Sequence, residues 1–160
     1  MRSILRKSVN IKRLRPSAKV PTYETASSAG CDLYAAFDIP EDKEREKPCV
    51  AIHPGETVFI PTGIAMEIPE DCVGLIYARS GLGCKKGLAP ANKVGVIDSD
   101  YRGEIMVALY NHGNKSQTIY NGDRIAQFIL TPYYQAKYQV VPELSDTDRG
   151  DKGFGSTGTN

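Results

Sequence analysis

The stretch Gly95-Val96-Ile97-Asp98-Ser99-Asp100-Tyr101-Arg102-Gly103-Glu104-Ile105 joins two apolar runs through a short polar segment. Strand-forming residues on both sides of such a segment predict a β-hairpin. A turn that only reverses the chain needs Gly, Asn or Asp. This one also carries Asp98, which could accept a proton from water, and Tyr101, whose ring could pack on a sugar or a base. The segment alone leaves two readings open: a surface turn with an Asp100–Arg102 charge pair, or part of a ligand site.

The rest of the chain repeats the same kind of pattern. Proline or glycine recurs at short intervals, and short apolar or alternating runs lie between them, which is typical of an all-β sandwich or barrel. A basic strand is expected to begin by Val9. The glycines between Ser80 and Gly87 make the one possible short helix doubtful. The clearest strand candidates are 57–60, 65–68, 73–77, 105–110 and 124–130.

The composition of the chain argues against several classes of function. The chain has 160 residues, 41% of them hydrophobic, and a formal net charge of +1, so neither nucleic acid nor a membrane is an expected partner. No apolar run is long enough for a transmembrane helix. None of the four cysteines forms a C-x-x-C pair, and only two histidines could assist them, which argues against a zinc site. Reduced thiols and a cytoplasmic location fit this cysteine usage best.

Two parts are expected along the chain. Residues 1–142 carry the strand pattern and predict one β-domain, interrupted by a charged loop at 41–47. Residues 143–160 are polar and glycine-rich and predict a flexible C-terminal tail. Phe154 stands alone between glycines in this tail. We expect it to dock on a flat surface when the tail closes.

Three further motifs carry polar groups beside apolar runs. Arg79, Ser80 and Gly81 follow a strand and could bind an anion. Asp32 is either a turn aspartate or a partner for the water shell of a metal ion. Gln127 could face a ligand or pair across a sheet. Phosphate-binding groups without a metal cage fit an enzyme that acts on a nucleoside polyphosphate, with Mg²⁺ held mainly by the substrate phosphates.

Taken in order, these motifs resemble those of the trimeric dUTPase family over nearly the whole chain. Five motifs match with compatible spacing: Ala29–Leu33, Arg79–Leu82, Gly95–Gly103, Gly122–Gln127 and Arg149–Gly158. The resemblance implies a jelly-roll-like β-fold and a homotrimer with three active sites at its subunit interfaces. It also implies Mg²⁺-dependent hydrolysis of dUTP to dUMP and pyrophosphate, which keeps uracil out of DNA and supplies dUMP for thymidylate synthesis.

The resemblance also implies a role for each matching residue. Asp98 would deprotonate the water that attacks the α-phosphorus, and an unperturbed Asp is ionised at pH 7. Tyr101 would lie under the deoxyribose and reject a 2′-hydroxyl, and Phe154 would stack on the uracil. Asp32 and Gln127 would orient the water shell of Mg²⁺ or the phosphates. The remaining implied substrate contacts are Arg79, Ser80, Gly81, Asn92, Gly95, Val96, Ile97, Met106, Arg149, Gly155, Ser156 and Thr157.

Two other functions remain to be weighed. A dCTP deaminase shares the expected fold but would need a catalytic glutamate in the hairpin region and a different third motif. A non-catalytic binding protein of the same fold would not need both Asp98 and the complete tail. The sequence therefore favours the hydrolase.

Overall fold

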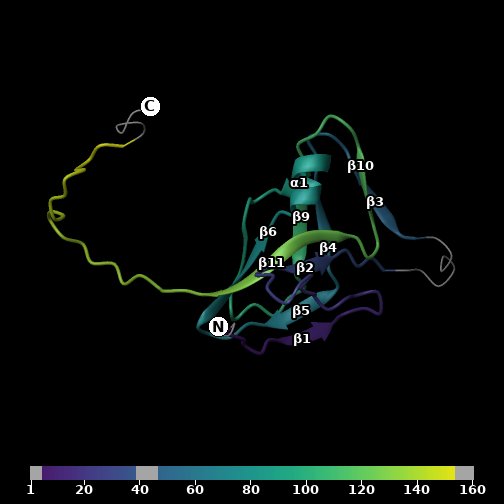
Figure 1. Ribbon diagram of the computed structural model, residues 1–160, viewed down its shortest axis with the longest axis horizontal. Coiled ribbons are helices and arrows are strands. Elements are labelled where there is room, and N and C mark those ends of the chain that lie inside the picture. Colours follow the sequence, from purple (N-terminus) through teal and green to yellow (C-terminus); the bar gives the residue numbers. More distant parts are fainter. Residues whose placement is uncertain (1–4, 39–46, 154–160) are drawn as a thin grey trace.

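The computed structural model describes residues 5–38 and 47–153, which fold into eleven short strands and a single helix (Figure 1). All the strand pairs are antiparallel. The helix is α1 (Ser80–Lys86). The strands are β1 (Asn10–Arg13), β2 (Cys31–Tyr34), β3 (Cys49–Ile52), β4 (Thr57–Pro61), β5 (Ile64–Glu67), β6 (Cys72–Tyr77), β7 (Leu88–Pro90), β8 (Gly95–Ile97), β9 (Met106–Asn111), β10 (Gln117–Tyr120) and β11 (Arg124–Pro132).

The strands form four small sheets around one core. Two sheets are larger, with strand orders β2-β11-β6-β8 and β4-β9-β7, and two are pairs, β1-β5 and β10-β3. The prediction of a mostly β-protein is therefore confirmed. Each sheet contributes to the hydrophobic core, in which the largest fully buried apolar side chains are Leu33, Ile52, Ile60, Ile64, Leu88, Ile105, Val107, Leu109, Ile119 and Ile125.

Burial alternates along the strands, as the sequence pattern predicts. In β6 every second residue is buried, and β9 has the same period. One polar side chain, Asn111, is completely buried in the core. Its amide nitrogen donates to the carbonyls of Ile52 at 2.8 Å and Lys115 at 2.9 Å, and its oxygen accepts from the Gly113 amide at 2.9 Å. These bonds offset the cost of burying the amide.

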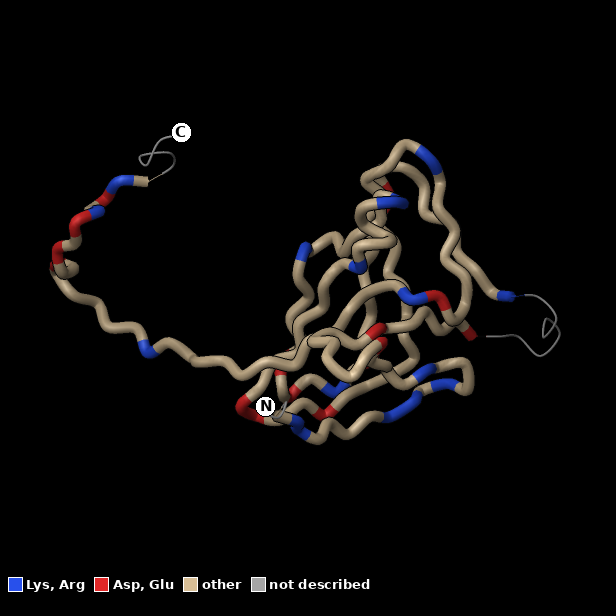
Figure 2. The backbone as a smooth tube through the Cα atoms, in the orientation of Figure 1, with Lys and Arg blue, Asp and Glu red and all other residues tan. Residues whose placement is uncertain are grey.

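The predicted basic N-terminal strand is also confirmed. β1 begins at Asn10 and pairs with β5, and Lys12 and Arg13 at its end are exposed. Lys and Arg gather along this strand and the turn that follows it (Figure 2). The charged loop predicted at 41–47 lies almost wholly outside the described residues.

The helix doubted on its glycine content does form. Gly87 ends α1 in the left-handed conformation with φ at 68°, and its amide donates to the Leu82 carbonyl. Leu82 is buried, and Lys85 and Lys86 lie in the last turn, where cations favour the helix dipole. This C-cap and the burial of Leu82 outweigh the low helix propensity of the glycines.

The predicted hairpin around Asp98 is wrong in its pairing. β8 pairs with β6, whereas β9 pairs with β4 and β7, so the two runs flanking the polar segment lie in different sheets. β7 and β9 are antiparallel neighbours in one sheet. Residues 91–105 connect them by crossing to the other sheet, where β8 lies, and back. Ile105 ends this crossing because its amide donates to the Ile64 carbonyl at 2.9 Å.

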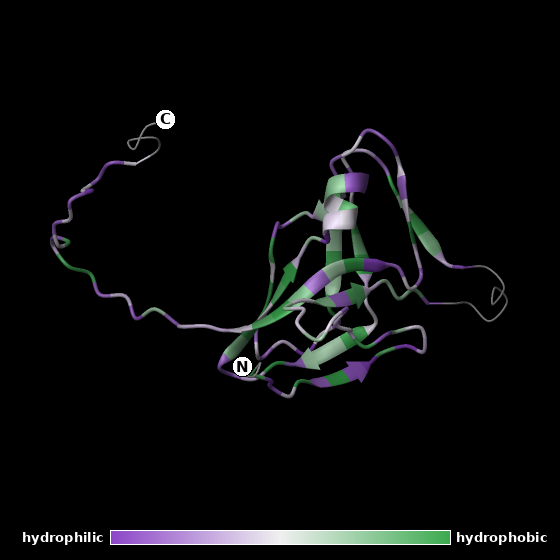
Figure 3. Ribbon diagram, viewed as in Figure 1, coloured by the Kyte–Doolittle hydropathy of each residue, from purple (hydrophilic) through white to green (hydrophobic). Residues whose placement is uncertain are grey.

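The chain leaves the body of the molecule at the end of β11. From there to residue 153 it has no regular strand or helix and runs away from the sheets (Figure 1). This exposed segment starts before the predicted boundary at residue 142 and contains hydrophobic stretches (Figure 3). Phe154, Gly155, Ser156 and Thr157 lie outside the described residues. Within the described part, no helix has the length and hydrophobicity needed to span a membrane.

Candidate active site

A buried carboxylate joins two arginines at one edge of the β2-β11-β6-β8 sheet. Asp32, in β2, is 4% exposed. Its Oδ1 accepts from Arg79 Nε at 2.7 Å, and its Oδ2 accepts from Arg124 Nη1 at 3.2 Å. Arg124 also donates to Glu24 Oε2 at 2.9 Å. The hydrogen bond that Arg124 donates to Asp32, reinforced by the negative charge of Asp32, raises the pKa of the Arg124 guanidinium. We call Glu24, Asp32, Arg79 and Arg124 the ionic cluster.

Other predicted phosphate contacts lie beside the ionic cluster. Gln127 in β11 is directly opposite Asp32 on one side and Tyr77 on the other, so the three side chains share one face of the sheet. Ser80 and Gly81 open α1 directly after Arg79. The first amides of a helix have no partner within it, and here they are available to donate hydrogen bonds to phosphate oxygens.

A second group of predicted residues lies on the crossing segment after β8. The Tyr101 amide donates to the Asp98 carbonyl at 3.2 Å, which closes a turn, and Arg102 Nη1 donates to the Ser99 carbonyl at 2.6 Å. Among the residues that the structure describes, no side chain bonds to the Asp98 carboxylate. Asp98 is also exposed, so its carboxylate is accessible to a water or a ligand.

Tyr101 is held back against its own segment. Its hydroxyl donates to the Glu104 carbonyl at 3.0 Å. Its ring covers the α-carbon of Gly103 so closely that a β-carbon there would lie 2.4 Å from the phenol oxygen. The ring is thus fixed at its tip and along its edge, while 44% of Tyr101 remains exposed.

The predicted base-binding residues border the same segment. Asn92 follows β7, and Lys93 beside it has φ at 65°, which is uncommon for a residue with a side chain. The Asn92 amide nitrogen lies 3.5 Å from the position that a Gly95 β-carbon would occupy. Val96 and Met106 are both exposed.

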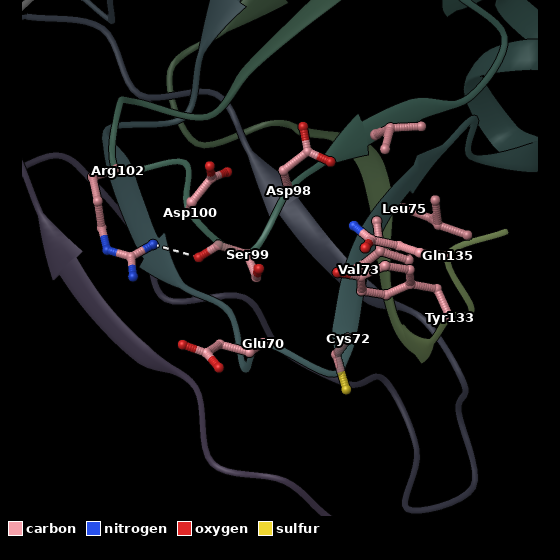
Figure 4. A pocket seen from close by; sticks show the side chains of 11 residues that line it. Glu70, Cys72, Val73, Leu75, Asp98, Ser99, Asp100, Arg102, Tyr133 and Gln135 are labelled. Carbon is pink, nitrogen blue, oxygen red and sulfur yellow. Dashed lines mark hydrogen bonds between the residues drawn. The ribbon is translucent and has the colours of Figure 1, made fainter. Parts of the chain in front are cut away.

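The Asp98 segment opens onto a cavity of about 750 Å³. Asp98, Ser99, Asp100 and Arg102 enter it from the segment after β8, and Tyr133 and Gln135 enter it from the start of the exposed C-terminal segment (Figure 4). The remaining wall residues come from the β5–β6 turn, β6 and β8: Glu70, Cys72, Val73, Leu75 and Val96.

The two groups do not meet within one chain. Asp32 lies in β2, whereas Asp98 follows β8 at the other edge of the same four-stranded sheet. Three strand spacings of about 4.8 Å, together with about four residues along β6, separate them by roughly 20 Å. Arg149 belongs to neither group: it lies in the exposed C-terminal segment, where its Nε donates to the Lys152 carbonyl at 2.9 Å.

Sequence reasoning missed three residues that shape these groups. Arg124 stands inside one of the quoted motifs, but its contact with Asp32 depends on a sheet register that the motif does not reveal. Glu24 and Glu104 carried no signal that separates them from ordinary surface acids. Among residues 5–38 and 47–153, no three His, Cys, Asp or Glu side chains gather closely enough to hold a metal ion.

Comparison with known proteins gives a consistent result over nearly the whole chain. Residues 16–158 match the model of the dUTPase family. The chain is 47% identical over 143 residues to a deoxyuridine 5′-triphosphate nucleotidohydrolase of Desulfitobacterium hafniense, with 89% of each chain covered. It is 42% identical over 160 residues to the enzyme of the same name from Hahella chejuensis, with 99% of each covered. Among solved structures, Staphylococcus bacteriophage 80alpha dUTPase with dUPNHPP has a TM-score of 0.83 at 28% identity, covering 96% of this chain and 99% of that one.

Proposed function

The chain belongs to the dUTPase family and hydrolyses dUTP, and we propose that it does so by in-line attack of a water activated by Asp98 on the α-phosphorus. The products are dUMP and pyrophosphate. The accessible Asp98 carboxylate on the rim of the cavity is the observation that carries this proposal. Phosphoryl transfer requires a positioned nucleophile and charge neutralisation more than covalent help, so one carboxylate base is sufficient.

The segment that carries Asp98 supplies the groups that recognise the nucleoside. The Asn92 side chain and the backbone of Gly95, Val96 and Ile97 read the uracil edge, with the Met106 backbone at their border. Backbone donors and acceptors can distinguish uracil from cytosine because the two bases present opposite hydrogen-bonding groups. Tyr101, fixed over Gly103, lies under the deoxyribose and leaves no room for a 2′-hydroxyl.

The ionic cluster and the first turn of α1 bind the phosphates. Asp32 holds the Arg79 guanidinium in place from a position away from solvent, and Ser80 and Gly81 offer backbone amides beside it. Mg²⁺ bound to the triphosphate would neutralise its charge. Both Asp32 oxygens already accept hydrogen bonds from guanidinium groups. This fits a Mg²⁺ ion that is held mainly by the substrate phosphates and that contacts Asp32 and Gln127 through water.

A complete site requires more than one copy of the chain. Asp98 and the ionic cluster lie roughly 20 Å apart, and the exposed segment carries Tyr134, Tyr138 and Val140 with almost no covering. Apolar side chains so exposed on an extended segment mark a protein interface. We therefore propose a homotrimer in which different copies supply the two groups. The tail residues Arg149, Phe154, Gly155, Ser156 and Thr157 then close over the substrate.

A deaminase is not favoured by the geometry. The one glutamate of the crossing segment is Glu104. Both of its carboxylate oxygens are occupied, by the Gly63 amide at 2.7 Å and by Arg15 at 2.8 Å. A carboxylate held in this way is poorly placed to act as a catalytic base.

A nucleotide panel tests the proposal. Pyrophosphate and ammonia release are measured with dUTP, dTTP, dCTP and UTP, in Mg²⁺ and in a chelator. We expect pyrophosphate from dUTP alone and only with Mg²⁺. Asp98→Asn should lower kcat by about 10²- to 10⁴-fold, the usual contribution of a general base. Asp100→Asn, a neighbouring acid without a proposed role, is the matched control. Unchanged turnover in the Asp98 variant would remove the general-base assignment.

A further inference from the structure

Glu104 links the crossing segment to two other parts of the chain. Its Oε1 accepts from the Gly63 amide in the β4–β5 turn at 2.7 Å, and its Oε2 accepts from Arg15 Nη2 at 2.8 Å. The side chains of Glu104 and Arg15 are only 21% and 16% exposed. The ion pair is thus largely shielded from water, and both carboxylate oxygens have a partner.

Arg15 extends this link to the chain beyond β2. Its Nη1 donates to the Ala36 carbonyl at 2.6 Å, and its Nε lies 3.2 Å from Asp38 Oδ1. A guanidinium is planar and rigid, so three simultaneous contacts fix its orientation. The N-terminal segment, the chain after β2 and the crossing segment are therefore joined through one side chain.

The backbone directly after Glu104 is also anchored, through Ile105. The Ile105 amide donates to the Ile64 carbonyl at 2.9 Å, and its carbonyl accepts from the Thr62 hydroxyl at 2.5 Å. Gly63 has φ at 68° and packs closely on the aliphatic part of Arg15, 3.1 Å from the position of a β-carbon. The turn that receives the Glu104 carboxylate therefore cannot shift without disturbing Arg15.

Glu104 in turn fixes the tip of the Tyr101 ring. The Tyr101 hydroxyl donates to the Glu104 carbonyl at 3.0 Å. Hence the main chain of Glu104 holds the Tyr101 ring, and the side chain of Glu104 is itself held by Arg15. We propose that Arg15 and Glu104 form a positioning pair. The pair fixes the position of the Tyr101 ring and thereby the ability of the enzyme to reject ribonucleotides.

This inference rests on the proposed role of Tyr101 and assigns the pair no contact with the substrate. A steric gate rejects one extra oxygen only when its wall cannot move, because a small displacement makes room for the hydroxyl. Removing Arg15 leaves the shielded Glu104 carboxylate without its ion pair, and removing the Glu104 charge leaves Arg15 with Asp38 as its one acidic partner among the described residues. Either change frees the crossing segment to move. The loss should therefore fall mainly on discrimination between dUTP and UTP.

The experiment compares Glu104→Gln, Arg15→Met and the double variant with the wild type. Glutamine keeps an oxygen for the Gly63 amide, but it replaces the charged oxygen that accepts from Arg15 with an NH2 donor. Lys7→Gln is the matched control, because Lys7 forms an exposed ion pair with Asp71 that involves none of Arg15, Glu104 and Tyr101. For each protein, kcat/KM is measured with dUTP and with UTP in Mg²⁺, together with thermal unfolding and oligomeric state.

We expect each single variant to lower the dUTP-to-UTP ratio of kcat/KM about tenfold, and the double variant to lower it no further, because both residues act through one contact. The control should keep the wild-type ratio. Arg15→Lys, which keeps the charge, should recover part of the ratio. A folded Glu104→Gln protein with the wild-type ratio would overturn the inference, as would single effects that multiply in the double variant.

Failure of the pair can be told apart from failure of the proposed function. If Tyr101→Ala loses discrimination while Glu104→Gln keeps it, the sugar gate stands and the positioning pair falls. If Tyr101→Ala also keeps discrimination, the gate itself is wrong and the inference falls with it. A general loss of structure would appear as a lower unfolding temperature or a dissociated assembly in place of an altered ratio.

Discussion

Replacing Gly103 with alanine tests the Tyr101 gate through a residue that touches no substrate. A β-carbon at Gly103 would lie 2.4 Å from the Tyr101 phenol oxygen, 2.6 Å from Cζ and 3.0 Å from Cε2. Ordinary van der Waals contact begins near 3.4 Å, so the ring must retreat by about 1 Å. That movement breaks the 3.0 Å bond from the hydroxyl to the Glu104 carbonyl.

The cost in stability should be small. An intramolecular hydrogen bond contributes about 0.5–1.5 kcal/mol. The phi angle of Gly103 is not in the left-handed region, so alanine adopts the same backbone without strain. Alanine also restricts the unfolded chain, which returns about 0.4–1 kcal/mol. The net change in the free energy of unfolding is therefore expected to stay below about 1 kcal/mol, or a few degrees in Tm.

The cost in selectivity should be much larger. We expect the dUTP-to-UTP ratio of kcat/KM to fall by about 10- to 100-fold, because a ring released from the Glu104 carbonyl is no longer a fixed wall against a 2′-hydroxyl. Steady-state kinetics with both nucleotides and a thermal melt measure the two effects on the same sample. An unchanged ratio in the folded protein would refute the argument that Gly103 holds the ring. A large fall in Tm would show that Gly103 serves the fold and not the gate.

Three further outcomes are expected. Gly74→Ala should lower the free energy of unfolding by about 1–3 kcal/mol, because the alanine β-carbon would lie 2.4 Å from the Phe128 ring in the packed core. A thermal melt measures the change, and a wild-type Tm would contradict this packing. Deletion of residues 149–160 should leave the proposed trimer folded but slow in dUTP hydrolysis, because the proposed closure of the tail over the substrate is lost; kcat at saturating dUTP is the measurement, and an unchanged rate would exclude a lid. A thiol reagent should label the exposed Cys49 and Cys84 in the native protein and the two buried cysteines only in denaturant. Burial raises the pKa of the Cys31 thiol, which further slows its reaction, so rapid labelling at Cys31 would contradict the core.

Local pattern was enough to predict most strands, because alternation and turn residues depend on neighbours in the sequence. The runs at 57–60 and 124–130 became β4 and β11, with ends shifted by a residue or two. The five ordered motifs were likewise sufficient for the family. The roles of individual site residues remain predictions, and Phe154 lies outside the described residues.

The sequence by itself therefore determined the β-class, the family and the candidate residues. Only the tertiary structure decided which strands pair, and it places β8 and β9 in different sheets. It also decided that Asp32 faces two arginines and that Arg15 meets Glu104, 89 residues farther along the chain. Strand partners and distant ion pairs depend on how sheets pack against one another, and no local pattern in the sequence encodes that packing.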